Sequence, residues 1–199
     1  MAVKINNNIM FYHIPRTGGS WFTNYVRVKC KSTNSLIGRR HGGDVHVKYN
    51  EYAKVSIIRH PMTWYPSMFC HSSDPVVAWK WTDNLLFLRE YKSENFNEFL
   101  NKCKDSKQPL YERVVDAVLG NKWEHIQHFI YYEKLIPASV SLLKELRFDA
   151  SLISAGEFAP IKKSFHKDIH SSNFKNSADN RLLKEVANKE TRILKQFYS

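Results

Sequence analysis

Short apolar runs bounded by turn or charged residues recur along the chain. The clearest are Ile9–Ile14, Val55–Ile58 and the stretch HFIYYE at 128–133. Runs of this length, ended at once by Pro, Gly or charged residues, are typical of strands buried on both faces. We therefore expect three strands of a mostly parallel sheet at these positions.

Helical spacing of apolar residues appears between and after these runs. Phe22, Tyr25 and Val26 recur at i, i+3 and i+4, which predicts a helix from about Ser20. Further helices are expected at 95–103, 110–120 and 137–148, and an apolar stripe of helical spacing predicts one at 182–197. Gly120 is expected to cap the helix at 110–120, and Phe148 to end the helix at 137–148. Strands separated by helices predict an α/β fold with three layers, in which helices flank a mostly parallel central sheet.

A loop with Pro and two adjacent glycines joins the first run to the first predicted helix, in "FYHIPRTGGSWFTNYV". Gly18 and Gly19 allow backbone N–H groups to close on phosphate oxygens without interference from a Cβ. Thr17 and Ser20 add hydroxyl donors, and Arg16 adds a permanent positive charge. Because a helix N-terminus follows, the loop predicts an anion site, and phosphate is the usual anion there.

A second polar segment follows the strand at Val55–Ile58, where "IIRHPMTWYPSMF" places Ser67 eight residues after Arg59. Arg can bind phosphate through two N–H donors at once. A Walker A motif is absent, because no Lys follows the glycines of the first loop. A magnesium-dependent nucleotide hydrolase also needs a carboxylate after a strand, and here Arg59 stands instead. We expect an anionic nucleotide bound without a metal.

Both segments together resemble the sulfotransferases that use 3′-phosphoadenosine 5′-phosphosulfate (PAPS), closest to the carbohydrate sulfotransferases with an HIPKTGG motif. Their 5′-phosphosulfate loop reads H-x-P-K-[ST]-G-[GT]-[ST], matched by "HIPRTGGS", and their 3′-phosphate element is an Arg followed eight residues later by a Ser. A strand-end Tyr-Glu before a Leu-rich helix is matched by "YYEKLIPASVSLLKEL", and an N-x-K by 173–175. The resemblance runs from Ile9 to Tyr198 and implies a P-loop-like nucleotide-binding fold.

The resemblance also implies roles for individual residues. It assigns Trp21 and Tyr132 to the adenine, although Trp21 is equally well explained as a core aromatic and Tyr132 as a half-buried strand end. It makes Lys175 a late phosphate contact, whereas a lone Lys is usually solvated. The donor would be held at its 5′ end and its 3′-phosphate by Arg16, Thr17, Gly18, Gly19, Ser20, Arg59 and Ser67.

Transfer to a hydroxyl also needs a general base, for which His is the commonest residue. In the carbohydrate sulfotransferases a Gly-x-His or Gly-His element between the two loops supplies it. The resemblance assigns this role to His41 in "GRRHGGDVHV", with His46 as the second candidate. Either could instead be a surface-loop His. His13 and His60 are expected to orient backbone. Where the family has Lys, this chain has Arg16, which can stabilise developing negative charge but hardly donate a proton.

The charge of the chain allows an anionic acceptor. Its 30 Lys and Arg against 19 Asp and Glu give a net charge of +11, without a basic tail. The densest excess lies at 27–48 and includes Arg39 and Arg40; it is either a solvated basic face or an anion-binding surface. An acceptor site could be lined by Trp79 and Trp81, with Tyr91; alternatively, these aromatic residues belong to the core.

Several classes of protein are disfavoured. No stretch of about 18 apolar residues predicts a membrane span, and the N-terminus does not resemble a secretory leader. Three widely spaced cysteines argue against a disulfide framework or a zinc site. No nucleic-acid-binding motif is recognised, so we expect no nucleic-acid partner. A cytoplasmic location is expected.

The sequence thus predicts one domain, residues 1–199, that transfers a sulfuryl group from PAPS to a hydroxyl of a carbohydrate or small metabolite. The alternatives are a magnesium-dependent nucleotide or small-molecule kinase that uses the same loop, and a non-catalytic nucleotide- or nucleic-acid-binding protein. The oligomeric state is left open.

Overall fold

A computed structural model describes residues 2–6, 8–29, 34–37, 50–72, 83–120, 123–148 and 179–199. The chain forms two compact units. The first comprises residues 1–59 and 118–165, and the second comprises 60–117 and 166–199. Neither unit is one continuous piece of sequence. The single domain expected over 1–199 stays a prediction.

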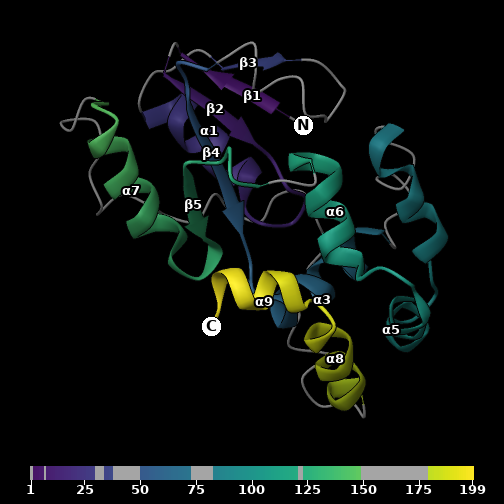
Figure 1. The fold of residues 1–199 in the computed structure, drawn as a ribbon. Helices are drawn as coiled ribbons and strands as arrows, with labels where there is room; N and C mark the ends of the chain where they lie inside the picture. The colour runs from purple at the N-terminus through teal and green to yellow at the C-terminus, as the bar shows by residue number, and fades with distance from the viewer. Residues whose placement is uncertain are drawn as a thin grey trace. The chain divides into compact units, whose positions relative to one another are not determined.

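The first unit is built on one five-stranded sheet (Figure 1), with the strand order β3-β1-β2-β4-β5. Its strands are β1 (Ala2–Ile5), β2 (Ile9–Tyr12), β3 (Asn34–Ile37), β4 (Ala53–Ile58) and β5 (His128–Tyr131). The β2–β4 and β4–β5 pairs are parallel, whereas β1 is antiparallel to both of its neighbours. Four strands therefore point the same way, which confirms an α/β fold with a mostly parallel sheet.

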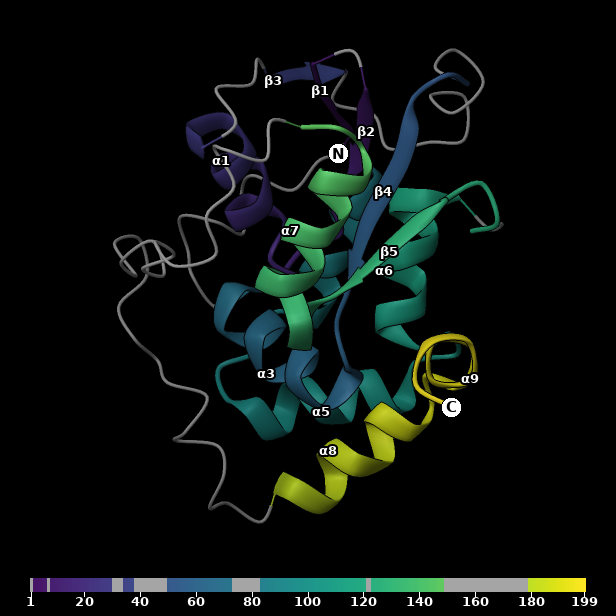
Figure 2. The same cartoon turned by 90° about the vertical axis from the view of Figure 1, so that its left-hand side faces the viewer.

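Two helices cover one face of this sheet, as Figure 2 shows for α7. They are α1 (Gly19–Lys29) and α7 (Leu135–Glu145). Phe22, Tyr25 and Val26, the residues whose spacing predicted α1, are buried in the same cluster as strand residues such as Phe11 and Ile57. The period of the sequence therefore identified the face of α1 that packs on the sheet.

The end of α7 corrects the sequence prediction, which had placed it at Phe148. The helix ends at Glu145, and Arg147 takes a left-handed conformation with φ of 59°. The Phe148 N–H donates to the Leu143 carbonyl (2.9 Å) and the Arg147 N–H to the Lys144 carbonyl (3.0 Å). This is a Schellman motif. Phe148 is buried because the motif turns the chain back onto the helix, not because the helix reaches it.

The second unit consists of helices where the structure describes it. They are α3 (Pro61–Ser72), the 3₁₀ segment η1 (Asp83–Tyr91), α5 (Phe96–Asp105), α6 (Leu110–Leu119), α8 (Asp179–Asn188) and α9 (Thr191–Phe197), and the last two residues of α6 lead into the first unit. Gly120 follows α6 with φ of 83°, as expected for a C-terminal cap. The apolar stripe expected as one helix over 182–197 forms two helices, α8 and α9. Among the described residues, no helix combines the length and the apolar character that crossing a membrane requires.

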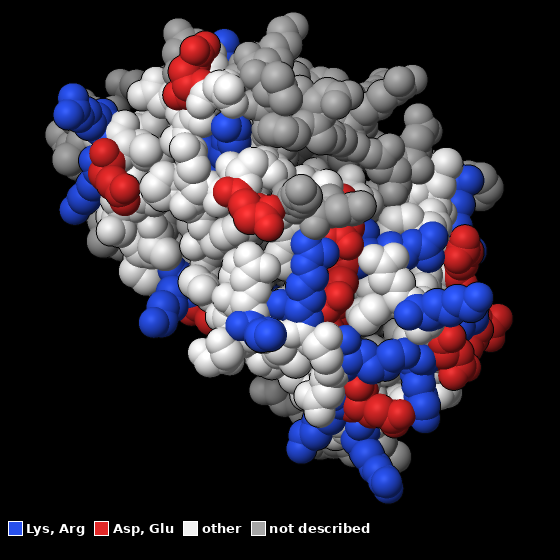
Figure 3. Space-filling view, viewed as in Figure 1, with Lys and Arg blue, Asp and Glu red and all other residues white. Residues whose placement is uncertain are grey.

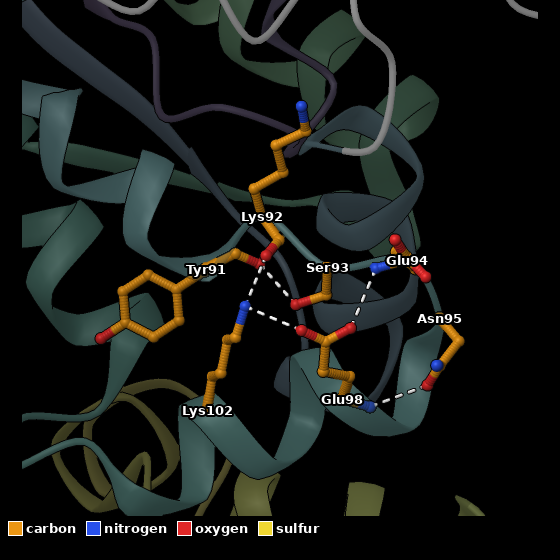
Figure 4. A network of polar contacts seen from close by, with 7 residues as sticks. All are labelled: Tyr91, Lys92, Ser93, Glu94, Asn95, Glu98 and Lys102. Carbon is orange, nitrogen blue, oxygen red and sulfur yellow. Dashed lines mark hydrogen bonds and ion pairs between the residues drawn. The ribbon is translucent and has the colours of Figure 1, made fainter.

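Side-chain hydrogen bonds at the N-cap Asn95 and at the preceding Glu94 begin α5, in an arrangement similar to a capping box (Figure 4). The Asn95 side chain accepts from the Glu98 N–H (2.9 Å), and the Glu98 carboxylate accepts in return from the Glu94 N–H (3.1 Å). Lys102 contacts the same carboxylate at 3.0 Å and donates to the Lys92 carbonyl at 2.6 Å. Glu98 is therefore occupied in fixing the start of the helix, and its hydrogen bond with Lys102 lowers the pKa of its carboxyl.

Acidic and basic side chains are interspersed on the surface of this unit (Figure 3). Ion pairs join Lys104 to Glu185 (3.1 Å) and Arg192 to Asp116 (2.8 Å). Arg113 lies 3.8 Å from Glu90. These ion pairs balance part of the basic charge on these helices.

Candidate anion-binding site

The loop between β2 and α1 lies wholly within the first unit. The Gly18 carbonyl accepts the Phe22 N–H (3.1 Å), which begins α1. Inside the loop, the Thr17 hydroxyl donates to the Ile14 carbonyl (2.8 Å), and Thr17 is entirely buried. Arg16 takes a left-handed conformation with φ of 66°. The loop is therefore a tight turn held from inside by Thr17.

Packing requires both glycines. Gly18 has φ of 95°, and a Cβ there would lie 2.9 Å from the Leu135 side chain and 3.1 Å from Tyr132. At Gly19 a Cβ would lie 2.2 Å from Cδ2 of His13, closer than any side chain tolerates. The two glycines thus let the loop lie directly against the imidazole of His13 and the segment that follows β5.

Arg59 links the ends of three neighbouring parallel strands. Because Ile58 pairs with Tyr131 in the β4–β5 register, Arg59 and Tyr132 follow the two strands side by side. The Arg59 guanidinium carbon lies 4.1 Å from the centre of the Tyr132 ring. Its Nη1 also donates to the Arg16 carbonyl at 3.1 Å. The carboxyl edge of the sheet, where α/β folds bind ligands, therefore brings two arginines together.

Arg16 and Arg59 contribute positive charge to this site, whereas His13 does not. Burial, with the nearby charge of Arg16 as the second cause, lowers the pKa of His13 to about 4. His13 is therefore neutral at physiological pH. Its ring stacks on Phe11 with 6.0 Å between ring centres and packs on Gly19, so it supports the loop.

No protein-family model matches this chain, and no curated protein or solved structure is significantly similar to it. Among the described residues, no group of three or more His, Cys, Asp or Glu side chains is arranged to hold a metal ion. The chemistry of the site is therefore inferred from its own residues and from the motif resemblance.

The structure brings together four of the residues expected at the nucleotide: Arg16, Gly18, Arg59 and Tyr132. Gly19 belongs to the same loop, and Ser20 is exposed in the first turn of α1. The Thr17 hydroxyl, expected to face a phosphate, is directed to the Ile14 carbonyl inside the loop.

Trp21 lies on the core side of α1. Its ring is parallel to that of Tyr25, 5.3 Å away, and is partly buried against the core. This favours the core interpretation of Trp21 over adenine stacking.

Other expected residues lie in the second unit. Ser67 is half-buried on α3, so its pairing with Arg59 stays a prediction. His60 orients backbone, as expected, because its Nδ1 accepts the Met62 N–H (3.2 Å) and its carbonyl accepts the Trp64 N–H (2.9 Å).

The residues expected at the acceptor and the base are described only in part. Tyr91 is buried and its hydroxyl donates to Ser106 (2.8 Å), which favours a core role. Outside the described residues lie Arg39, Arg40, His41, His46, Trp79, Trp81 and Lys175.

Sequence reasoning missed the contact between Arg59 and Tyr132 and the packing of Leu135 on Gly18. Both depend on which strands are neighbours. The sequence held a signal for the contact between Arg59 and Tyr132, since each residue lies at the end of an expected strand. A mostly parallel sheet was expected, but nothing in the sequence indicated that these two strands are neighbours in it.

Proposed function

We propose that this protein is a PAPS-dependent sulfotransferase with a P-loop-like fold. The observation that carries the proposal is the hydrogen bond between Arg59 and the Arg16 loop at the carboxyl ends of β4 and β2. PAPS carries anionic groups at both ends of its ribose, so it needs two cationic contacts on one sheet edge. Arg16 with the first turn of α1 would hold the 5′ end, and Arg59 with Ser67 the 3′-phosphate.

In the proposed reaction the acceptor hydroxyl oxygen attacks the sulfur atom. The bond from sulfur to the bridging phosphate oxygen breaks, and adenosine 3′,5′-bisphosphate leaves with that electron pair. The Arg16 guanidinium stabilises the charge that develops on the leaving phosphate and stays protonated throughout. As in phosphoryl transfer, positioning and charge neutralisation supply most of the rate.

The base that takes the hydroxyl proton is proposed to be His41. We expect His41→Ala to abolish turnover, measured as sulfate transfer from labelled PAPS, while the affinity for the bisphosphate stays within about twofold, because a general base contributes to the reaction and not to binding. The His46→Ala variant is the matched comparison. A fully active His41→Ala enzyme would transfer the role to His46.

Calorimetry with adenosine 3′,5′-bisphosphate tests the nucleotide site directly. We expect micromolar binding that does not depend on magnesium and is lost in Arg59→Ala. Arg27→Ala is the control, because Arg27 is exposed on α1 and its guanidinium donates to Asn24. Unchanged affinity in Arg59→Ala would contradict the proposal. Tighter, magnesium-dependent binding of ATP would favour the kinase instead.

The acceptor is proposed to be a hydroxyl compound that tolerates or prefers negative charge. This rests on the basic excess around Arg39 and Arg40. At low salt, Arg39→Ala together with Arg40→Ala should raise KM for a sulfated or carboxylated polysaccharide acceptor and leave KM for PAPS unchanged. If the acceptor KM of the double variant equalled that of the wild type, this part of the proposal would be wrong.

A further inference from the structure

We infer that Tyr132 is a positioning residue for Arg59, whose guanidinium it orients toward both the bound anion and the β2–α1 loop. The inference rests on the proposed function, and it gives Tyr132 a role other than the adenine contact expected from the motif. Its basis is the contact of Tyr132 with two separate parts of the site, Arg59 and Gly18.

The first contact places the Arg59 guanidinium over the Tyr132 ring. A guanidinium at 4.1 Å from a ring centre is within the range of a cation–π interaction. A flat cation lying on an aromatic ring keeps the N–H donors at its edge available. One of these donors, on Nη1, bonds to the Arg16 carbonyl at 3.1 Å. The ring therefore selects one orientation of a long side chain that otherwise has many rotamers.

The second contact fixes the ring itself. Tyr132 begins the short 3₁₀ turn η2 (Tyr132–Lys134) directly after β5, and it is half-buried. A Cβ added at Gly18 would lie 3.1 Å from the ring edge, so the glycine and the ring are in close contact. Because Gly18 is in the loop and Tyr132 follows β5, the ring packs against the same loop that Arg59 holds by a hydrogen bond.

These contacts make one connected unit of the ring, the guanidinium and the loop. Arg16 occupies a left-handed conformation that residues other than Gly adopt rarely, and the hydrogen bond from Arg59 to its carbonyl helps to hold it there. Without the ring, Arg59 would sample other rotamers and the Arg16 carbonyl would lose a fixed donor. The contacts with both ends of the nucleotide would weaken together.

A double-mutant cycle on bisphosphate affinity tests this. Tyr132→Phe keeps the ring and should bind within about twofold of the wild type. Tyr132→Leu should bind about tenfold more weakly, which lies within the range measured for cation–π contacts. Arg59→Lys keeps the charge but cannot stack and donate in the same way, and should also lose about tenfold. In the Arg59→Lys background, Tyr132→Leu should cost less than about threefold.

If the Tyr132 ring were purely structural, or bound adenine, the effect of Tyr132→Leu would not depend on Arg59. Tyr132→Leu would then weaken bisphosphate binding by the same factor in the wild-type and in the Arg59→Lys backgrounds, and that equal cost would overturn the inference. Unchanged affinity in Arg59→Lys would also overturn it. The Arg59→Lys variant leaves the Tyr132 ring in place, so it keeps the inference testable if Tyr132→Leu does not fold.

An NMR readout separates this inference from the proposed function, since it needs no nucleotide. The side-chain signals of Arg59 should be shifted by the ring current of Tyr132, in the wild type and in Tyr132→Phe alike, and should lose that shift in Tyr132→Leu. If the shift is present but the bisphosphate does not bind, the proposed function fails and the positioning of Arg59 by the ring stands. If the shift is absent in the wild type, the positioning role fails.

Discussion

The His13 ring packs directly against Gly19 and leaves no room for a side chain there. The imidazole lies where a side chain at position 19 would be, so the residue must be Gly at this point of α1. The neighbouring Gly18 is required for a second reason, its φ of 95°. Packing against His13 and the backbone conformation of the loop therefore each require a glycine here.

Gly19→Ala should destabilise the protein, because the new Cβ would overlap the His13 ring. Overpacking of this kind costs about 1–3 kcal/mol. The measurement is the free energy of unfolding in urea. Gly120→Ala is a control without a steric partner, since nothing lies within 4 Å of its Cβ position, and it should show only the cost of its positive φ. Adding His13→Ala to Gly19→Ala should restore part of the loss; no recovery would contradict the contact.

Titration of His13 should make the first unit less stable in mild acid. The pKa of His13 is lowered from 6.5 to about 4, mainly by burial, so the unfolded chain binds the proton more readily. Stability from this group is present above pH 6.5 and is lost as the pH falls toward 4. The difference in unfolding free energy between wild type and His13→Gln should therefore shrink from about pH 7 to about pH 5. A constant difference would show that His13 titrates normally.

At the level of elements, α6 and α9 cap each other through two glutamates. The buried Glu190 carboxylate, just before α9, accepts the N–H groups of Tyr111 and Glu112, both at 2.9 Å, in the first turn of α6. It also accepts the Tyr65 hydroxyl. In return the Glu112 carboxylate accepts the Arg192 N–H (2.8 Å) in the first turn of α9. Each helix N-terminus thus receives a carboxylate from the other.

Glu190 should give the protein a pH dependence opposite to that of His13. Burial raises the pKa of its carboxyl to about 7, although hydrogen bonds from Tyr65 and two backbone N–H groups oppose the rise. Between pH 4.5 and about 7 the unfolded chain ionises first, so stability falls as the pH rises through this window. Glu190→Gln should remove this decrease, which amounts to roughly 1–3 kcal/mol of unfolding free energy measured in urea across the window. If the stability of Glu190→Gln depended on pH as that of the wild type does, Glu190 would not be the source of the decrease.

How far each element was predictable depends on whether its pattern is local. The strands β2, β4 and β5 are mostly apolar, and α5 and α6 carry regular helical stripes, so local sequence was sufficient for them. The strand β1 is interrupted by Lys4 and spans only four residues, and its turn uses Asn6 in a left-handed conformation (φ 49°). The helix α3 has Pro66 in its interior and so carries a weak helical signal. Pairing and burial, which are not local, decide these elements.

At the scale of the whole molecule, the chain passes between the two units three times, at 59/60, 117/118 and 165/166. The first unit is incomplete until β5 has been added, and β5 follows the helices α3, α5 and α6 in sequence. Neither unit can be separated by one cut. This connectivity also divides the expected nucleotide residues, because Arg59 ends one segment and Ser67 lies in the next.

We expect thermal unfolding in a single transition, because neither unit is a continuous segment that could unfold as an independent domain. Calorimetry measures this as a ratio near one between the calorimetric and van't Hoff enthalpies. Pro109→Ala, a change in the loop before α6, serves as a control that should shift the midpoint without splitting it. Two separated transitions would show that the units are independent domains.

The sequence by itself determined the buried strands, the apolar faces of the regular helices and the two basic, donor-rich segments, because each is encoded by residues close together in the chain. Only the tertiary structure decided that β4 and β5 are neighbours, that Arg59 therefore lies on Tyr132 and holds the Arg16 carbonyl, and that Glu190 is buried at the start of α6. These features depend on strand order and on helix packing between distant segments, which no local pattern specifies.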